Sequence, residues 1–158
     1  MNEPVETLLF GLDKLDMLLR MYTRDFGAEH WSARPGDSLH SAHWILAHLA
    51  LSLNQEAGAE RVFSEELDKA FDFGAPGTED PATWPGVEEL QASFAAGRAA
   101  LAERWRARTQ EEWLAPVPEN RLGMKNKAQG AMFVLEHAVY HVGQLGAIRR
   151  MLGLKGVV

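Results

Sequence analysis

The sequence predicts an all-α protein in which four long helices form a bundle. Apolar residues recur at three- and four-residue steps over four long stretches, which is the spacing that gives a helix one buried face. No segment shows the clear alternation of apolar and polar residues that is typical of a strand. The four helices are expected near residues 3–26, 38–57, 84–108 and 128–152.

The first stretch carries the end signals of a helix. Pro4 stands at a plausible first helical position, with acidic residues near it and basic residues near the far end. Gly27 is a suitable stop. The Pro35-Gly36 pair then predicts a turn, so residues 30–36 are interpreted as a loop.

The second stretch is apolar nearly all round between Trp44 and Leu53, which predicts a helix buried on several sides. Asp37 or Ser38 is its expected N-cap. His48 is the only ionisable residue between Trp44 and Leu53. A titratable ring is therefore expected in a part of the core that excludes water.

A long crossover separates the second and third helices. Its pattern is loose from about residue 55 to residue 86, with a short extra helix expected over 61–71 and a loop over 74–81. A connection of this length can run back along a helix of about 27 Å before the next helix begins.

Two shorter features follow the third helix. Thr109 and Glu112 have the spacing of a capping box and predict a short turn that ends at Trp113-Leu114. Residues 115–127 are expected to form an extended excursion or a hairpin.

Composition and charge exclude several classes of partner. The chain, 1–158, suits a single domain with a substantial core, and 46% of its residues are apolar. A net charge of −6 without a basic run argues against nucleic acid. The basic cluster Arg149-Arg150, with Lys155 beyond it, favours the C-terminal end of a helix. No stretch suits a membrane span or a signal sequence, so we expect no membrane partner and a cytoplasmic location.

The sequence contains no cysteine. Disulfides, thiolate metal ligands and a cysteine nucleophile are therefore excluded. Any metal ion must be held by imidazole, carboxylate or water, and any thiol chemistry requires a thiol from outside the protein.

Three histidines are the candidate functional residues. His137 and His141 lie four residues apart on the apolar face of the fourth helix, about 40° apart around its axis and about 6 Å along it, so both can reach one metal ion. His48 adds a third ring from the second helix. Buried imidazoles need polar partners. A divalent metal with an open position is one solution, and hydrogen bonds to backbone carbonyls or to the hydroxyls of Ser52 or Tyr140 are the other.

Other polar residues near these histidines receive lesser roles. His40 and His43 fall in the more polar first turns of the second helix and are interpreted as exposed or as outer neighbours of the site. Glu136 belongs to a solvated face, about 100° around the helix from its neighbour His137. Gln144 shares the stripe of His137 and is suited to line the pocket or bond a ligand's second nitrogen.

Three motifs together resemble the DinB/YfiT-like superfamily of four-helix-bundle proteins, which are described as metal-dependent. They are Trp31-Ser32-Ala33-Arg34-Pro35-Gly36, Trp44-Ile45-Leu46-Ala47-His48-Leu49, and His137-Ala138-Val139-Tyr140-His141-Val142-Gly143-Gln144-Leu145 running into Arg149-Arg150-Met151-Leu152-Gly153. The resemblance implies an up-down-down-up topology, a divalent ion on His48, His137 and His141, and a homodimer. Residues 55–127 carry no motif that matches the family. We expect Trp44, Ser52, Tyr140 and Gln144 to line the pocket or contact the ligands.

The resemblance also implies a function. Some relatives are thiol-dependent S-transferases or isomerases that use mycothiol, bacillithiol or glutathione, so we expect a metal-bound thiolate that attacks a small electrophile. A metal-dependent hydrolase that uses metal-bound water and a stress-related metal-binding protein without turnover are the alternatives. Zinc, nickel, iron and manganese all suit three imidazoles. A haem is a remoter option, because it requires opposed ligands.

Overall fold

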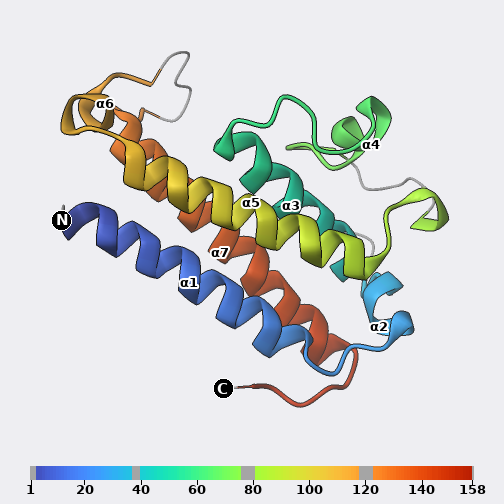
Figure 1. The fold of residues 1–158 in the computed structure, drawn as a ribbon. Helices are drawn as coiled ribbons and strands as arrows, with labels where there is room; N and C mark the ends of the chain where they lie inside the picture. The colour runs from blue at the N-terminus through green and yellow to red at the C-terminus, as the bar shows by residue number, and fades with distance from the viewer. Residues whose placement is uncertain (1–2, 37–39, 76–80, 118–122, 158) are drawn as a thin grey trace.

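The computed structural model describes residues 3–36, 40–75, 81–117 and 123–157, and these residues contain no strand. The expected all-α bundle is confirmed (Figure 1). Its four long helices are α1 (Glu3–Thr23), α3 (Ala42–Ala57), α5 (Val87–Ala107) and α7 (Lys127–Met151). Shorter elements connect them: α2 (Ala28–Ser32), α4 (Glu65–Ala70), the 3₁₀ turn η1 (Pro81–Thr83) and α6 (Gln110–Leu114).

Helix α3 begins later than its expected start at residue 38. Its first residue is Ala42, and the Ser41 side chain accepts a hydrogen bond from the Trp44 backbone N–H at 3.2 Å. The two caps expected from the sequence, Asp37 and Ser38, lie outside the described residues. Serine at any of several neighbouring positions can cap a helix, so the pattern alone does not choose between them.

The prediction of a loop over residues 30–36 is wrong for the first three of them. The short helix α2 includes these three, and Gly27 is its N-cap. The Gly27 backbone N–H donates to Nδ1 of His30 at 2.9 Å, which satisfies a donor at the start of the helix. Trp31 is buried edge-on against Phe26, with ring centroids 5.3 Å apart. Burial of this aromatic pair stabilises a helical turn that lacks the usual capping residues.

The other short elements follow the sequence more closely. The extra helix expected over 61–71 is confirmed in a shorter form as α4. At the start of α6 both hydrogen bonds of the capping box between Thr109 and Glu112 are present. Of the segment 115–127, residues 118–122 lie outside the described part. Its ends meet where the Lys127 backbone N–H donates to the Ala115 carbonyl at 3.0 Å.

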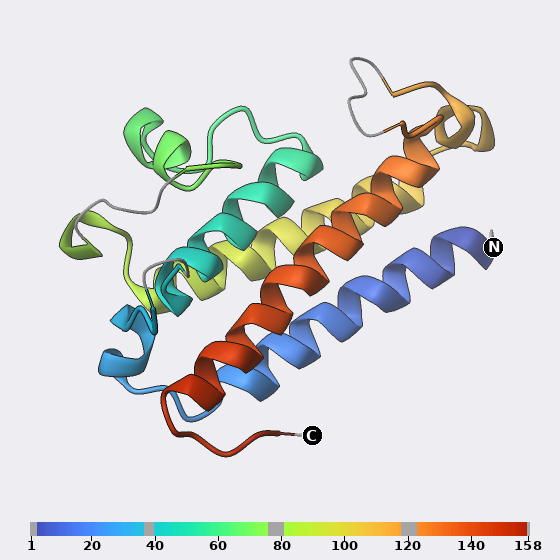
Figure 2. The same ribbon diagram turned by 180° about the vertical axis from the view of Figure 1, so that it is seen from behind.

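Helices α1 and α7 lie side by side and run in the same direction (Figures 1 and 2). Gly11 of α1 faces Leu135 of α7, and further along both helices Tyr22 faces Gly146. Since the residue numbers increase together, the two helices are parallel.

Helices α3 and α5 form the second parallel pair. His43 at the start of α3 bonds to the Pro85 carbonyl just before α5, and Asn54 near the end of α3 bonds to the Ser93 carbonyl. The crossover through α4 and η1 returns the chain to the starting end of α3. The pair α3 and α5 runs in the opposite direction to α1 and α7 (Figure 1).

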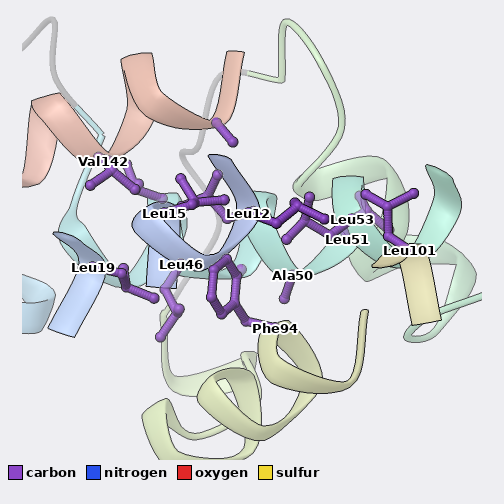
Figure 3. Close-up of a cluster of buried hydrophobic side chains, with 14 of the residues drawn as sticks. Leu12, Leu15, Leu19, Leu46, Ala50, Leu51, Leu53, Phe94, Leu101 and Val142 are labelled. Carbon is purple, nitrogen blue, oxygen red and sulfur yellow. The ribbon is translucent and has the colours of Figure 1, made fainter. Parts of the chain in front are cut away.

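The core lies between the two pairs, and α3 is its most enclosed helix. Ten of the sixteen residues of α3 are buried, which confirms the prediction of a helix covered on several sides. Figure 3 shows side chains from all four long helices meeting there. The labelled residues are Leu12, Leu15 and Leu19 of α1, Leu46, Ala50, Leu51 and Leu53 of α3, Phe94 and Leu101 of α5, and Val142 of α7.

The C-terminal end of α7 is fixed by a buried cation. Arg149 is only 1% exposed and forms a two-pronged ion pair with Asp25, in which Nη2 lies 2.8 Å from Oδ2. It also donates to the backbone carbonyls of Tyr22 and Lys155. The hydrogen bond from Arg149 lowers the pKa of the Asp25 carboxyl to about 2. Arg149 therefore joins the ends of α1 and α7 to the C-terminal tail.

Helices α3 and α5 approach most closely at Gly97. A methyl group on its Cα would lie 2.6 Å from the side-chain nitrogen of Asn54 and 3.0 Å from the Asn54 backbone nitrogen. The Asn54 side chain cannot easily retreat, because it donates to the carbonyls of Ala50 and Ser93 at 2.8 and 2.9 Å. Gly143 in α7 is the opposite case, since a methyl group on its Cα would meet nothing within 4 Å among the described residues outside its own helix turn.

We therefore expect Gly97→Ala to lower the free energy of unfolding by up to about 2 kcal/mol, because overpacking costs about 1–3 kcal/mol and the helix-propensity gain offsets only about 1 kcal/mol of it. The matched control Gly143→Ala keeps the helix-propensity gain without overpacking, so it should raise the free energy of unfolding by about 0.5–1 kcal/mol. Urea titrations of both variants, followed by circular dichroism, measure the difference. Equal stabilisation by both substitutions would contradict this account of the α3–α5 contact.

Candidate metal centre

His48 projects from the enclosed helix α3 toward α7 and is only 3% exposed. Its Nδ1 lies 2.6 Å from the carbonyl oxygen of Phe71 in the crossover. A carbonyl can only accept, so Nδ1 carries the proton and Nε2 is left with a lone pair. Trp44 stacks on the His48 ring, with centroids 5.0 Å apart and planes 7° apart. The ring is therefore fixed in both orientation and tautomer.

His141 on α7 is held in a similar way by its own helix. It is 8% exposed, and its Nδ1 lies 2.8 Å from Oε1 of Gln144. The Gln144 amide nitrogen in turn donates to the Tyr140 hydroxyl at 3.1 Å. This chain of hydrogen bonds makes Nδ1 of His141 the donor and leaves Nε2 as the available ligand atom. Such outer partners commonly orient metal-binding histidines.

His137 completes a convergent group with these two residues. Its Nε2 lies 2.8 Å from Nε2 of His48, and one ring nitrogen of each histidine lies within 4.8 Å of the other two. Imidazole nitrogens bound to one tetrahedral metal ion lie about 3.4 Å apart. The 2.8 Å pair and the 4.8 Å limit are compatible with that spacing, so the three nitrogens could hold one ion.

Burial keeps these imidazoles neutral, as metal binding requires. Desolvation is the largest cause that lowers the pKa of each ring, and it brings the pKa of His141 to about 4. The neighbouring His48 lowers the pKa values of His137 and His141 further, whereas the Phe71 carbonyl partly offsets the effect on His48. At neutral pH each neutral ring keeps one nitrogen lone pair that can bind an ion.

The histidine group opens onto a cavity of about 690 Å³ between α3 and α7. His48 and His137 line its inner end, and Ser52 lies on its α3 wall. Most of the remaining wall is apolar. An ion on three imidazoles retains an open coordination position, and small-molecule sites are typically apolar cavities with a few placed polar groups. The arrangement therefore suits chemistry at a metal ion on a small organic molecule.

The structure places the four residues expected around the ligands in distinct positions. Trp44 is buried over His48, and its indole N–H donates to the Ala70 carbonyl at 2.9 Å. Ser52 lines the cavity. Gln144 bonds directly to His141, one of the candidate metal ligands. Tyr140 is mostly exposed, and it contacts the His141 ring and accepts a hydrogen bond from Gln144.

His40 and His43 stand outside the convergent group. His40 stacks on Trp44 with ring centroids 3.7 Å apart, and His43 donates through Nε2 to the Pro85 carbonyl. Both are partly buried rather than fully exposed. Glu136 is exposed, as the helix geometry predicted.

Three contributors to the site were missed from the sequence. The Phe71 carbonyl is a backbone group, which no residue type reveals. Phe73 follows in the same loop, within the region that carries no family motif, and contacts His137 with centroids 6.2 Å apart. Phe133 lies one helical turn before His137, with centroids 6.0 Å apart. Its four-residue spacing from His137 was the available signal.

The match to a protein-family model decides the family. The model of the DinB superfamily matches residues 12–145, which include all three histidines. The chain belongs to the DinB superfamily. A comparison with curated proteins found no significant match. Within the described residues, no helix of this DinB-superfamily protein has the length and hydropathy needed to cross a membrane.

We expect the protein to bind one divalent ion per chain. Replacing His48, His137 or His141 by alanine should weaken binding by more than about 100-fold, because each removes one of three ligands. Gln144→Leu should weaken it by about 10–100-fold through the loss of the His141 hydrogen bond. Titration with Zn²⁺ against a competing chelator, with circular dichroism as a check of folding, measures these effects.

His43→Ala is the matched control, since His43 lies on the same helix but bonds to Pro85 away from the group. It should leave metal affinity unchanged. The ligand assignment is wrong if the His43 variant loses the ion while the His48 variant keeps it. It is equally wrong if a double alanine variant of His137 and His141 still binds one equivalent.

Proposed function

We propose that this DinB-superfamily protein is a divalent-metal-dependent S-transferase that joins an external low-molecular-weight thiol to a small electrophile. In this reaction a sulfur–carbon bond forms, the bond from that carbon to its leaving group breaks, and the leaving group takes the bonding electron pair. The thiol proton passes to solvent. The observation that supports the proposal is the convergence of three neutral imidazoles, two of which line a mostly apolar cavity.

A divalent ion held by these histidines would lower the pKa of a coordinated thiol and so supply a thiolate nucleophile near neutral pH. The chain itself provides the orientation. The Phe71 carbonyl and Gln144 fix the rings of His48 and His141, and the neutral histidines leave the charge of the ion uncompensated, which favours an anionic nucleophile. Zinc, nickel, iron and manganese are all compatible with this ligand set.

The absence of cysteine means that the thiol must be a second substrate. The same proposal places the protein in the cytoplasm, where low-molecular-weight thiols are kept reduced. A role in the response to stress would follow if the electrophiles are reactive toxic compounds.

The proposal predicts thiol consumption that depends on both metal and electrophile. Protein purified without a histidine tag and loaded with Zn²⁺, Ni²⁺, Fe²⁺ or Mn²⁺ is assayed with glutathione, bacillithiol or mycothiol against a panel of electrophiles. Chelation and His137→Ala should each remove the activity, whereas His43→Ala should retain it. Turnover of esters or amides without any thiol would replace the proposal by a hydrolase, and metal binding without turnover across the panel would replace it by a binding protein.

We further propose that the protein is a homodimer formed through α1 and α7. Phe10 and Met17 of α1 are exposed, and so are Met132 and Val139 of α7. Each pair is spaced by seven residues and therefore lies on one face of its helix. Exposed apolar faces on two adjacent helices are typical of protein–protein contacts.

The dimer is expected to persist at micromolar concentration in sedimentation velocity. The double substitution Phe10→Asp and Val139→Asp should shift it to a species near the 17.6 kDa of one chain, because burying two carboxylates opposes association. Leu114→Asp, which also replaces an exposed apolar residue but on α6, is the control and should not change the mass. A single species of one-chain mass for the unaltered protein would contradict the proposal.

A further inference from the structure

The cavity beside the histidines has a composition that restricts what it can bind. Its α3 wall is formed by Leu49, Ser52 and Leu53 beyond His48, and its α7 wall by Phe133, Val134 and Ala138 around His137. The residues that follow Phe71 in the crossover supply the remaining side. A volume of about 690 Å³ is large enough for a molecule of drug-like size, and a mostly apolar wall favours an apolar body.

Two phenyl rings line the cavity next to His137. Phe73 and Phe133 come from different elements, and each ring contacts the His137 ring, with centroids 6.2 and 6.0 Å apart. Phe73 is 82% exposed. Exposure of a phenyl group is unfavourable in water, so a ligand that covers this ring gains free energy from its burial. The two rings are placed to hold a flat or extended apolar group beside the histidine group.

The charges around the cavity are negative. Asp72 and Glu56 line it, one next to Phe73 and the other toward the C-terminal end of α3. Among the described residues, no lysine or arginine is part of its wall. Burial raises the pKa of Glu56, and Arg108 and Arg104 partly offset this effect, but neither arginine lines the cavity. A carboxylate or phosphate on the ligand's body would meet acidic side chains with no cation of the wall to pair with it.

We infer that this cavity binds the electrophile, and that the electrophile is an apolar, aryl- or alkyl-bearing molecule without an anionic group. Phe73 and Phe133 hold its apolar body, and Asp72 disfavours anionic relatives. That the ligand is an electrophile rests on the proposed S-transferase function. Binding in this cavity, however, can be measured without turnover.

Two probe molecules with the same phenethyl group separate the contribution of apolar contact to the binding affinity from the contribution of charge. Phenethyl methyl sulfone is uncharged, and 2-phenylethanesulfonate carries one negative charge on a similar head group. Ligand-detected NMR titration gives the affinity of each for the metal-free protein. The sulfone should bind at least about fivefold more tightly than the sulfonate, because in this form only the cavity wall acts on the charge of the ligand.

Variants of the wall assign this preference to residues. Phe73→Ala and Phe133→Ala should each weaken binding of the sulfone by about tenfold, since each removes one apolar face. Leu114→Ala, which removes an exposed apolar side chain on α6, should leave the affinity for the sulfone unchanged. Asp72→Asn should reduce the difference in affinity between the sulfone and the sulfonate by about twofold or more. Glu6→Gln on α1, which does not line the cavity, should leave this difference unchanged. Because Phe73 is largely exposed, its variant is expected to fold normally.

The results discriminate between the inference and the function on which it rests. Equal or tighter binding of the sulfonate to the metal-free protein, or full affinity of the Phe73 variant for the sulfone, would overturn the inference. Sulfone binding with the expected variant effects, but no thiol-dependent turnover, would leave the apolar site standing and remove the S-transferase. Turnover that is equally fast with anionic and neutral electrophiles would remove the inferred substrate class and keep the S-transferase.

Discussion

A buried imidazole must have both of its ring nitrogens satisfied, and His48 imposes this requirement at the centre of the bundle. Helix α3 is covered on nearly every side, and His48 is only 3% exposed. The Phe71 carbonyl takes one nitrogen and His137 faces the other. The crossover before α5 and the middle of α7 are thereby tied to the same residue. Fold and candidate site therefore depend on one another through a single side chain.

The crossover has a larger part in the site than a connecting segment usually has. Three consecutive residues supply different functions: Phe71 is buried and orients His48 through its carbonyl, Asp72 contributes charge at the cavity, and Phe73 contacts His137. A segment that must return along α3 to keep α3 and α5 parallel passes directly over the histidine group. The long connection is thus both a topological need and the third wall of the cavity.

The middle and the C-terminal end of α7 are held by different contacts. The histidine group and its outer partner Gln144 lie along the middle of α7, while Arg149 holds the C-terminal end to Asp25 and to the tail. The sequence pattern indicates only that Arg149 favours the end of a helix. In the structure it is also a buried cation, because the carboxylate and carbonyls that pair with it come from α1 and from beyond α7.

The sequence by itself determined the four helices to within a few residues at each end, and the shared face of His137 and His141, because helical periodicity and a four-residue spacing are local properties. It also placed His48 in an enclosed helix. Only the tertiary structure decided that Phe71 and Phe73 lie beside the histidines and that Arg149 is buried. These features depend on backbone carbonyls, which are alike in every residue, and on contacts between distant segments. No local sequence pattern encodes the position of a backbone carbonyl in the fold or a contact between distant segments.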